Sequence, residues 1–84
     1  MAQLLYFSWV RERVGRSEET LPIPPGVDTV TDLITHLQTL GSGYQAAFAE
    51  PERVRIAVNQ MHVQPDHPVT DQDEIAFFPP VTGG

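Results

Sequence analysis

The residue types that could support chemistry lie at the end of the chain, where residues 79–84 spell PPVTGG. Six residues in extended form reach about 20 Å, and paired prolines stiffen the base of such an arm. Gly83 and Gly84 have no side chains, so their backbone could enter a narrow channel and bring the terminal carboxyl group to a buried active site. We therefore expect residues 79–84 to form a flexible tail, with Gly84 as its reactive end.

The chemistry of such a tail begins with its carboxylate, which is ionised at neutral pH and is a poor electrophile. A partner enzyme that consumes ATP could join this carboxylate to AMP as an acyl-adenylate. Sulfide could then displace AMP and leave a C-terminal thiocarboxylate, or a persulfide could displace AMP and a thiol then reduce the resulting acyl disulfide to the same product. The deprotonated sulfur of the thiocarboxylate is nucleophilic. The tail would deliver one sulfur atom and return to the carboxylate.

Length and composition favour a small carrier over an enzyme with a deep pocket. The chain has 84 residues, enough for one domain spanning residues 1–84, and a domain of this size has a thin core. It contains no cysteine, which excludes disulfides and a cysteine nucleophile of its own. Its net charge of −6 disfavours nucleic acid and anionic membranes and favours a partner with a basic face. Without a signal-peptide pattern or a membrane-length apolar run, we expect a cytoplasmic protein.

Apolar patterning in the first quarter of the chain predicts two strands. Residues 4–10 are predicted to form the first strand, and residues 11–14 a helical turn that Gly15 stops. Residues 18–23 are predicted to form a second strand that pairs with the first. Prolines and a glycine then break the chain before the next element.

The clearest helix has apolar residues at helical spacing in Val30, Leu33, Ile34, Leu37 and Leu40. Thr29 and Asp32 predict a capping box at its N-terminus. Gly41 and Gly43 predict its C-terminal stop. Residues 44–50 are predicted to form a second short helix.

The remaining elements complete the predicted fold. Residues 53–58 alternate as a strand, residues 59–60 turn into a return strand at 61–64, and residues 74–78 form the last strand. The order β-β-α-β-β-β, with the main helix packed on one face of a mixed sheet, predicts an α+β roll of the β-grasp or ubiquitin-like type. In this fold the first and last strands are parallel neighbours in the middle of the sheet.

The first and last strands are apolar on both faces, although one helix can cover only one face of so small a sheet. We assign to the core Leu4, Tyr6, Val54, Ile56, Val58, Ile75 and Phe77. We assign to the open face Leu5, Phe7, Ala57, Ala76 and Phe78. Such an exposed apolar row predicts a partner-binding surface that leads into the tail. The alternatives are that Tyr44 and Phe48 fold back over this row, or that the two faces are inverted.

Other residues offer weaker signals for a site. His36, His62 and His67 lack the spacing of metal ligands. Residues 71–74 are explained better by turn chemistry before a strand than by a calcium loop. The sequence has no phosphate-binding loop and no dinucleotide fingerprint. We therefore expect no metal and no bound cofactor, with ATP consumed in the active site of the activating partner.

The C-terminal residues resemble those of a known family. The segment DHPVTDQDEIAFFPPVTGG, residues 66–84, is similar to the C-terminal signature of the small subunits of molybdopterin synthase. Further matching segments are LYF at 5–7, VRE at 10–12, Gly15 and VNQ at 58–60. His62 departs from the pattern, because an apolar residue is more usual at its position. The resemblance covers most of the chain.

This resemblance implies a specific activity and specific partners. Gly84, preceded by Gly83, would be adenylated by an adenylyltransferase related to ubiquitin-activating enzymes and then converted to a thiocarboxylate. In a heterotetramer of small and large subunits, the tail would insert into the large subunit, which carries the catalytic side chains. There it would supply the dithiolene sulfurs of molybdopterin, made from cyclic pyranopterin monophosphate. The implied partner contacts are Phe7, Arg11, Phe78, Pro79, Pro80, Val81 and Thr82.

Three other functions share some of these features. A sulfur carrier for thiamine or cysteine synthesis would use the same terminal chemistry, although the FFPPVTGG ending favours molybdopterin synthesis. A protein modifier that forms isopeptide bonds to lysines would also need an activated terminal glycine. An inert binding module with a disordered end would need only the globular part.

Overall fold

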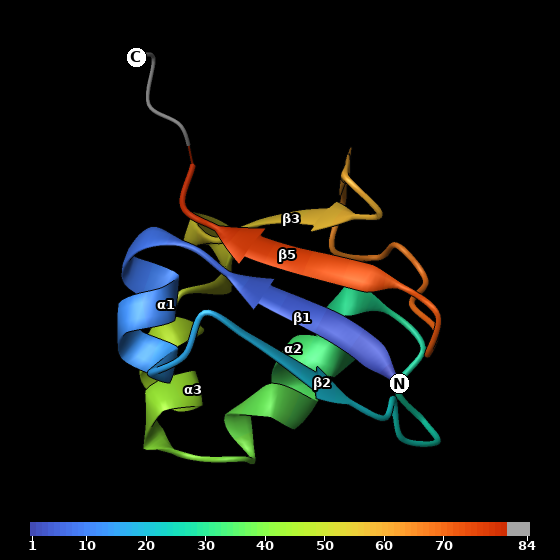
Figure 1. Cartoon of the computed structure of the whole chain (residues 1–84), viewed down its shortest axis with the longest axis horizontal. Coiled ribbons are helices and arrows are strands. Elements are labelled where there is room, and N and C mark those ends of the chain that lie inside the picture. The colour runs from blue at the N-terminus through green and yellow to red at the C-terminus, as the bar shows by residue number, and fades with distance from the viewer. Residues whose placement is uncertain (81–84) are drawn as a thin grey trace.

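Five strands form one mixed sheet in the order β2-β1-β5-β3-β4 in the computed structural model, which describes residues 1–80 of the chain (Figure 1). The strands are β1 (Ala2–Tyr6), β2 (Glu18–Leu21), β3 (Arg55–Val58), β4 (Met61–Val63) and β5 (Glu74–Phe78). The helices are α1 (Ser8–Val14), α2 (Val30–Gln38) and α3 (Ser42–Ala47), with a short 3-10 helix, η1, at Pro51–Arg53.

The central strands β1 and β5 run parallel, with Leu4 opposite Ile75 and Tyr6 opposite Phe77. The β1–β2, β3–β5 and β3–β4 pairs are antiparallel. This topology confirms the predicted β-grasp fold. Because the two central strands are parallel neighbours, their C-terminal ends lie side by side at one end of the sheet.

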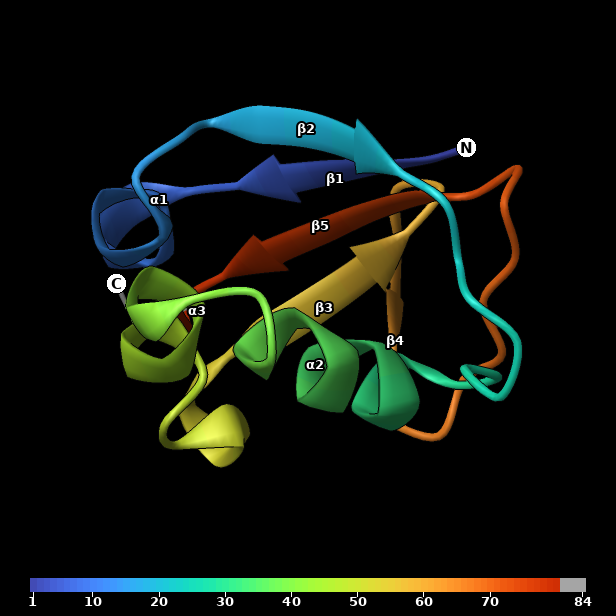
Figure 2. The ribbon, with the colours of Figure 1, turned by 90° about the horizontal axis from the view of Figure 1, so that it is seen from below.

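The core lies on the face of the sheet that α2 and α3 cover, while α1 lies at the end of the sheet (Figure 2). All the residues assigned to the core are buried, namely Leu4, Tyr6, Val54, Ile56, Val58, Ile75 and Phe77. From α2, the buried residues are Val30, Leu33, Ile34 and Leu37. Full burial of one large apolar side chain stabilises a fold by about 1.5–3 kcal/mol, so this alternation decides which face of the sheet is closed.

The capping box predicted for α2 is confirmed. The Asp32 amide donates to the Thr29 hydroxyl oxygen at 3.2 Å, and the Thr29 amide donates to the Asp32 carboxylate at 3.2 Å. These bonds satisfy two backbone donors that the first turn of a helix leaves without intrahelical partners. The helix is shorter than predicted: it ends at Gln38, and Leu40 is exposed.

The predicted glycine stop of α2 is wrong. Gly41 is the N-cap of α3, and Gly43 lies inside α3. A Cβ atom on Gly43 would lie 2.5 Å from the carbonyl oxygen of Arg13, the penultimate residue of α1. Glycine at this position therefore serves the close approach of α3 to α1 rather than the end of a helix.

Residues 4–10 do not form the single strand that the sequence predicts. β1 ends at Tyr6, Phe7 is the extended N-cap of α1, and the Val10 amide donates to the Phe7 carbonyl at 3.1 Å. The turn into α1 buries Val10 completely, so packing against the core decides the conformation of this apolar run. Gly15 ends α1 with φ of 94°, as predicted.

Two other strand boundaries also differ from the prediction. β2 ends at Leu21 because Pro22, the next residue, has no amide proton for a ladder. β3 begins at Arg55 because Pro51–Arg53 forms η1. Proline at the first position of a helical turn needs no amide partner there, which favours η1 over a longer strand.

The predicted hairpin between β3 and β4 is confirmed. Asn59 and Gln60 both have positive φ, 51° and 71°, as a two-residue hairpin turn of type I′ requires. The Asn59 side chain also accepts from the Glu74 amide and donates to the Asp73 carboxylate, both at 3.0 Å. Asp73 in turn accepts from the Thr70 amide at 2.8 Å. The acidic segment before β5 is thus used in turns, as predicted.

Among the helices of residues 1–80, none has the length and apolar character needed to cross a membrane.

Candidate functional site

The face of the sheet opposite α2 and α3 carries the apolar row predicted from the sequence. Leu5 of β1 lies opposite Ala76 of β5, which lies opposite Ala57 of β3. Side chains at opposed positions share one face of a sheet, so these residues form a continuous strip. Ala57 differs from the prediction because it is only 8% exposed; its short side chain, on a strand paired on both sides, is screened by its neighbours.

Neither alternative for this face is correct. Phe48 packs edge-to-face on Phe77 with ring centroids 5.1 Å apart, and Tyr44 packs edge-to-face on Tyr6 at 6.5 Å. Phe77 and Tyr6 belong to the buried face, so both rings from α3 and its C-cap lie on the core side. The open face keeps Phe7, which is 47% exposed, and the partly exposed Phe78.

The predicted contact residues of the described part gather where β1 and β5 end. The Phe7 amide donates to the Phe77 carbonyl at 3.1 Å, which fixes the end of β1 beside Phe78. Arg11 is exposed on α1, the helix that starts directly after Phe7. Pro79 and Pro80, which are half-buried, continue the chain from the end of β5. The predicted residues Val81, Thr82, Gly83 and Gly84 lie outside the described residues.

Phe78 makes an aromatic contact with a residue of β4. The imidazole of His62 packs edge-to-face on the Phe78 ring, with centroids 5.3 Å apart and an interplanar angle of 72°. His62 is exposed and lies opposite Ala57 in the β3–β4 pair, so it extends the open face to its edge strand. We name the open-face side chains Leu5, Phe7, His62, Ala76 and Phe78 the docking strip.

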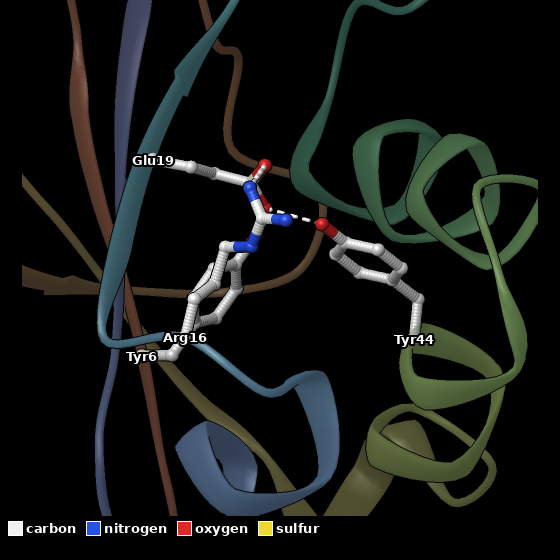
Figure 3. Close-up of polar contacts among 4 residues, drawn as sticks. All are labelled: Tyr6, Arg16, Glu19 and Tyr44. Carbon is white, nitrogen blue, oxygen red and sulfur yellow. Dashed lines mark hydrogen bonds and ion pairs between the residues drawn. The ribbon is translucent and has the colours of Figure 1, made fainter.

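A polar cluster of Tyr6, Arg16, Glu19 and Tyr44 lies on the side of the sheet opposite the docking strip (Figure 3). The hydroxyls of Tyr6 and Tyr44 both donate to one carboxylate oxygen of Glu19, at 2.8 and 2.7 Å. Arg16 donates to the other oxygen at 3.1 Å, and the Glu19 side chain is only 12% exposed. The cluster joins β1, β2 and α3 at Tyr6, the last residue of β1 and the residue before Phe7.

Burial and the bonds to Glu19 change the acidity of both phenols. Desolvation, followed by the hydrogen bond to Glu19, raises the pKa of Tyr6 far above its usual value. The same two causes, in the same order, raise the pKa of Tyr44. Both phenols therefore stay protonated donors in the folded state. No pattern in the sequence marks this cluster, because Tyr6 and Tyr44 are 13 and 25 residues away from Glu19 and follow no common period.

The chemistry that the described residues offer is recognition. Within residues 1–80, no group of three or more histidine, aspartate or glutamate side chains is arranged to hold a metal ion. The docking strip instead offers aromatic and aliphatic surface, which anchors protein–protein interfaces. It leads without interruption into Pro79 and the tail.

Comparisons with known proteins agree with this geometry. The ThiS family matches residues 4–84. The molybdopterin synthase sulfur carrier subunit of Escherichia coli is 42% identical over 84 residues, with full coverage of both chains. The corresponding subunit of Haemophilus influenzae is 33% identical, also with full coverage of both. A solved structure from Pyrococcus furiosus, assigned as molybdopterin converting factor subunit 1, superposes with a TM-score of 0.75 at 30% identity, covering 95% of this chain and 97% of that one. The chain therefore belongs to the ThiS family, and its curated relatives are molybdopterin synthase sulfur carrier subunits.

Proposed function

We propose that this chain is the sulfur carrier subunit of a molybdopterin synthase and that Gly84 carries the sulfur as a thiocarboxylate. The observation that carries the proposal is the family match, which runs through the last residue and covers the docking strip and tail together. The full-length likeness to the Escherichia coli sulfur carrier subunit supports the same assignment.

Loading of the tail needs two displacement reactions. In the first, a carboxylate oxygen of Gly84 attacks the α-phosphorus of ATP, and pyrophosphate leaves. In the second, a sulfide nucleophile attacks the acyl carbon, the new C–S bond forms, and the bond to AMP breaks. The first reaction occurs in the active site of an activating adenylyltransferase. Because the chain has no cysteine to hold sulfur itself, the sulfur of the second reaction comes from a separate donor. ATP is then a cosubstrate of that partner and not a cofactor of this chain.

Sulfur delivery takes place in the large subunit of the synthase. The docking strip binds that subunit, and Pro79 and Pro80 direct the tail into its active site, where the catalytic side chains act. The thiocarboxylate sulfur forms a C–S bond to the pterin precursor as an oxygen substituent of the precursor leaves. Water then attacks the acyl carbon and breaks the acyl C–S bond, which restores the carboxylate and returns the carrier to its starting state. Each loaded carrier supplies one sulfur, so the dithiolene requires two rounds of loading. A heterotetramer of small and large subunits suits this arrangement.

The test is reconstitution from purified components. The full chain is thiocarboxylated and mixed with the large subunit from the same organism and cyclic pyranopterin monophosphate, and molybdopterin is measured by fluorescence of its oxidised product. We expect wild-type chain to support synthesis and a variant lacking Gly84 to bind the large subunit but to support none. Synthesis by the truncated variant would refute the role of Gly84.

Intact mass spectrometry of the chain from its own cells separates the remaining alternatives. A sulfur carrier shows a fraction in which one oxygen is replaced by sulfur. A protein modifier shows instead adducts of high mass on a denaturing gel. A carrier for another pathway would be loaded with sulfur but inactive in the reconstitution.

A further inference from the structure

Arg55 places a positive charge beside the tail exit. It is the first residue of β3 and lies directly opposite Phe78, the last residue of β5. Opposed residues on antiparallel strands have Cβ atoms about 4.5–5.5 Å apart on the same face. The exposed Arg55 side chain therefore borders the docking strip next to Phe78.

A cavity of about 460 Å³ opens at this corner of the sheet. Its walls include Pro51, Glu52, Arg55, His62, Gln64 and Pro65. β4 ends at Val63, which pairs with Ile56. Arg55 therefore has no partner on β4, and the cavity lies beside this unpaired position. The corner can thus admit a side chain from a molecule bound to the docking strip.

Arg55 makes no ion pair within residues 1–80. The ion pairs in this part of the chain join Arg16 to Glu19 at 3.1 Å and Arg53 to Glu50 at 3.5 Å. Glu52 shares the cavity wall but does not come within ion-pairing distance of Arg55. A protein that covers Phe78 would also remove water from the guanidinium, which is unfavourable unless an anion replaces the water.

Acidic side chains elsewhere on the open face make Arg55 the position of this face that attracts a carboxylate of a bound partner. Glu18 lies opposite Leu5 at the far edge of the docking strip, and Glu74 lies two residues before Ala76 on the same face of β5. A carboxylate on a partner would be repelled at those positions and attracted at Arg55. The charge pattern therefore favours the orientation in which a carboxylate of the partner lies at Arg55.

We propose that an aspartate or glutamate side chain of the large synthase subunit enters the cavity and pairs with Arg55 when the docking strip binds. This inference rests on the proposed function, because it names a contact within the same interface. It makes Arg55 a specificity-determining residue: the apolar strip supplies contact area, and the pair fixes register so that Phe78 and the tail meet their sites. His62 connects the two features, because it lines the cavity and its ring packs on Phe78.

Calorimetric titration of the full chain with the large subunit tests the pair. We expect Arg55→Glu to weaken binding at least tenfold and Arg55→Gln to weaken it about fivefold. Arg53→Glu is the matched control, because it makes the same charge change nearby on a residue that borders a different cavity. The control should stay within twofold of wild type. Raising the salt concentration should weaken wild-type binding more than that of Arg55→Gln.

Cross-linking locates the partner group. The chain has no cysteine, so Arg55→Cys provides one site for a benzophenone maleimide. We expect this probe to cross-link to a large-subunit peptide that contains aspartate or glutamate, and the same probe at Thr35→Cys, on the exposed side of α2, to give no adduct.

The outcomes separate this proposal from the assignment of function. If wild type and Arg53→Glu bind and support sulfur transfer while Arg55→Glu binds within twofold of them, the pair is refuted and the function stands. If the wild-type chain neither binds the large subunit nor supports transfer, both fail. Binding at least tenfold weaker for Arg55→Glu alone supports the pair.

Discussion

Gly43 shows how the absence of one carbon atom controls the packing of two helices. A Cβ atom there would meet the Arg13 carbonyl oxygen at 2.5 Å and the Val14 carbonyl oxygen at 3.3 Å. Backbone atoms at the end of α1 cannot move aside as a flexible side chain would. The two helices therefore approach as closely as they do only because residue 43 is glycine.

Gly43→Ala should lower stability, although alanine is the better helix former. The forced separation of α1 and α3 should cost about 1–3 kcal/mol, as overpacking generally does. Thermal unfolding followed by circular dichroism measures the change. Gly41→Ala is the matched control, because a Cβ atom at that position meets only a Tyr44 ring carbon at 3.8 Å. Equal melting temperatures for wild type and Gly43→Ala would contradict the packing argument.

Glu19 is the acceptor on which the buried polar cluster depends. Glu19→Ala removes the carboxylate and leaves the Tyr6 hydroxyl, in a side chain that is 1% exposed, without its partner. We expect a loss of about 1–3 kcal/mol in the free energy of unfolding, the usual cost of an unsatisfied buried donor. Urea titration gives the value. Glu18→Ala, a neighbouring exposed position on β2, should change stability by much less.

The same cluster makes stability sensitive to alkaline pH. The pKa values of Tyr6 and Tyr44 are raised in the folded state, whereas phenols in the unfolded chain titrate at about pH 10. Below that pH both states are protonated and the stabilisation is complete; above it the unfolded chain releases protons that the folded chain retains, so stability falls. Urea titrations from pH 8 to 11 should show this decline, and Tyr44→Phe should reduce its slope. A free energy of unfolding that does not change with pH in wild type would refute the role of these two phenols.

At the scale of elements, period-2 alternation predicted the faces of the strands correctly. Each core residue assigned on β1, β3 and β5 is buried, because a strand with one face on the core allows only one register. The boundary between β1 and α1 could not be predicted in the same way. Apolar residues 4–10 fit a strand and a strand–helix junction equally well, and burial of Val10 by distant elements decided between them.

Phe77 and Phe78 provide a direct test of these faces, because they are adjacent and point in opposite directions. Phe78→Asp should leave the far-UV circular dichroism unchanged and weaken binding to the large subunit more than tenfold, as loss of an aromatic anchor does. Phe77→Asp should unfold the chain, since Phe77 is fully buried. Unfolding by Phe78→Asp would show that its ring stabilises the body rather than the interface.

The candidate site was predictable only in part, for a reason that concerns distance along the chain. Phe7 and Phe78 could be placed together because the β-grasp topology makes β1, which ends one residue before Phe7, the neighbour of β5. Arg55 and the Tyr6–Glu19–Tyr44 cluster could not, because their roles depend on exact register and on the path of loops. A hydrophobic pattern fixes which face a residue occupies, whereas side-chain partners depend on contacts that no local period encodes.

For the molecule as a whole, the position of β5 has a mechanical consequence. The tail continues a strand that is hydrogen-bonded on both sides, to β1 and to β3. A pull on Pro79 acts along this strand and loads both ladders in shear, so many bonds resist together instead of opening one after another as at a peeled edge. If the tail enters a narrow channel of the large subunit, as we propose, this geometry would let a reusable carrier withdraw it after each delivery without unfolding the strand behind it.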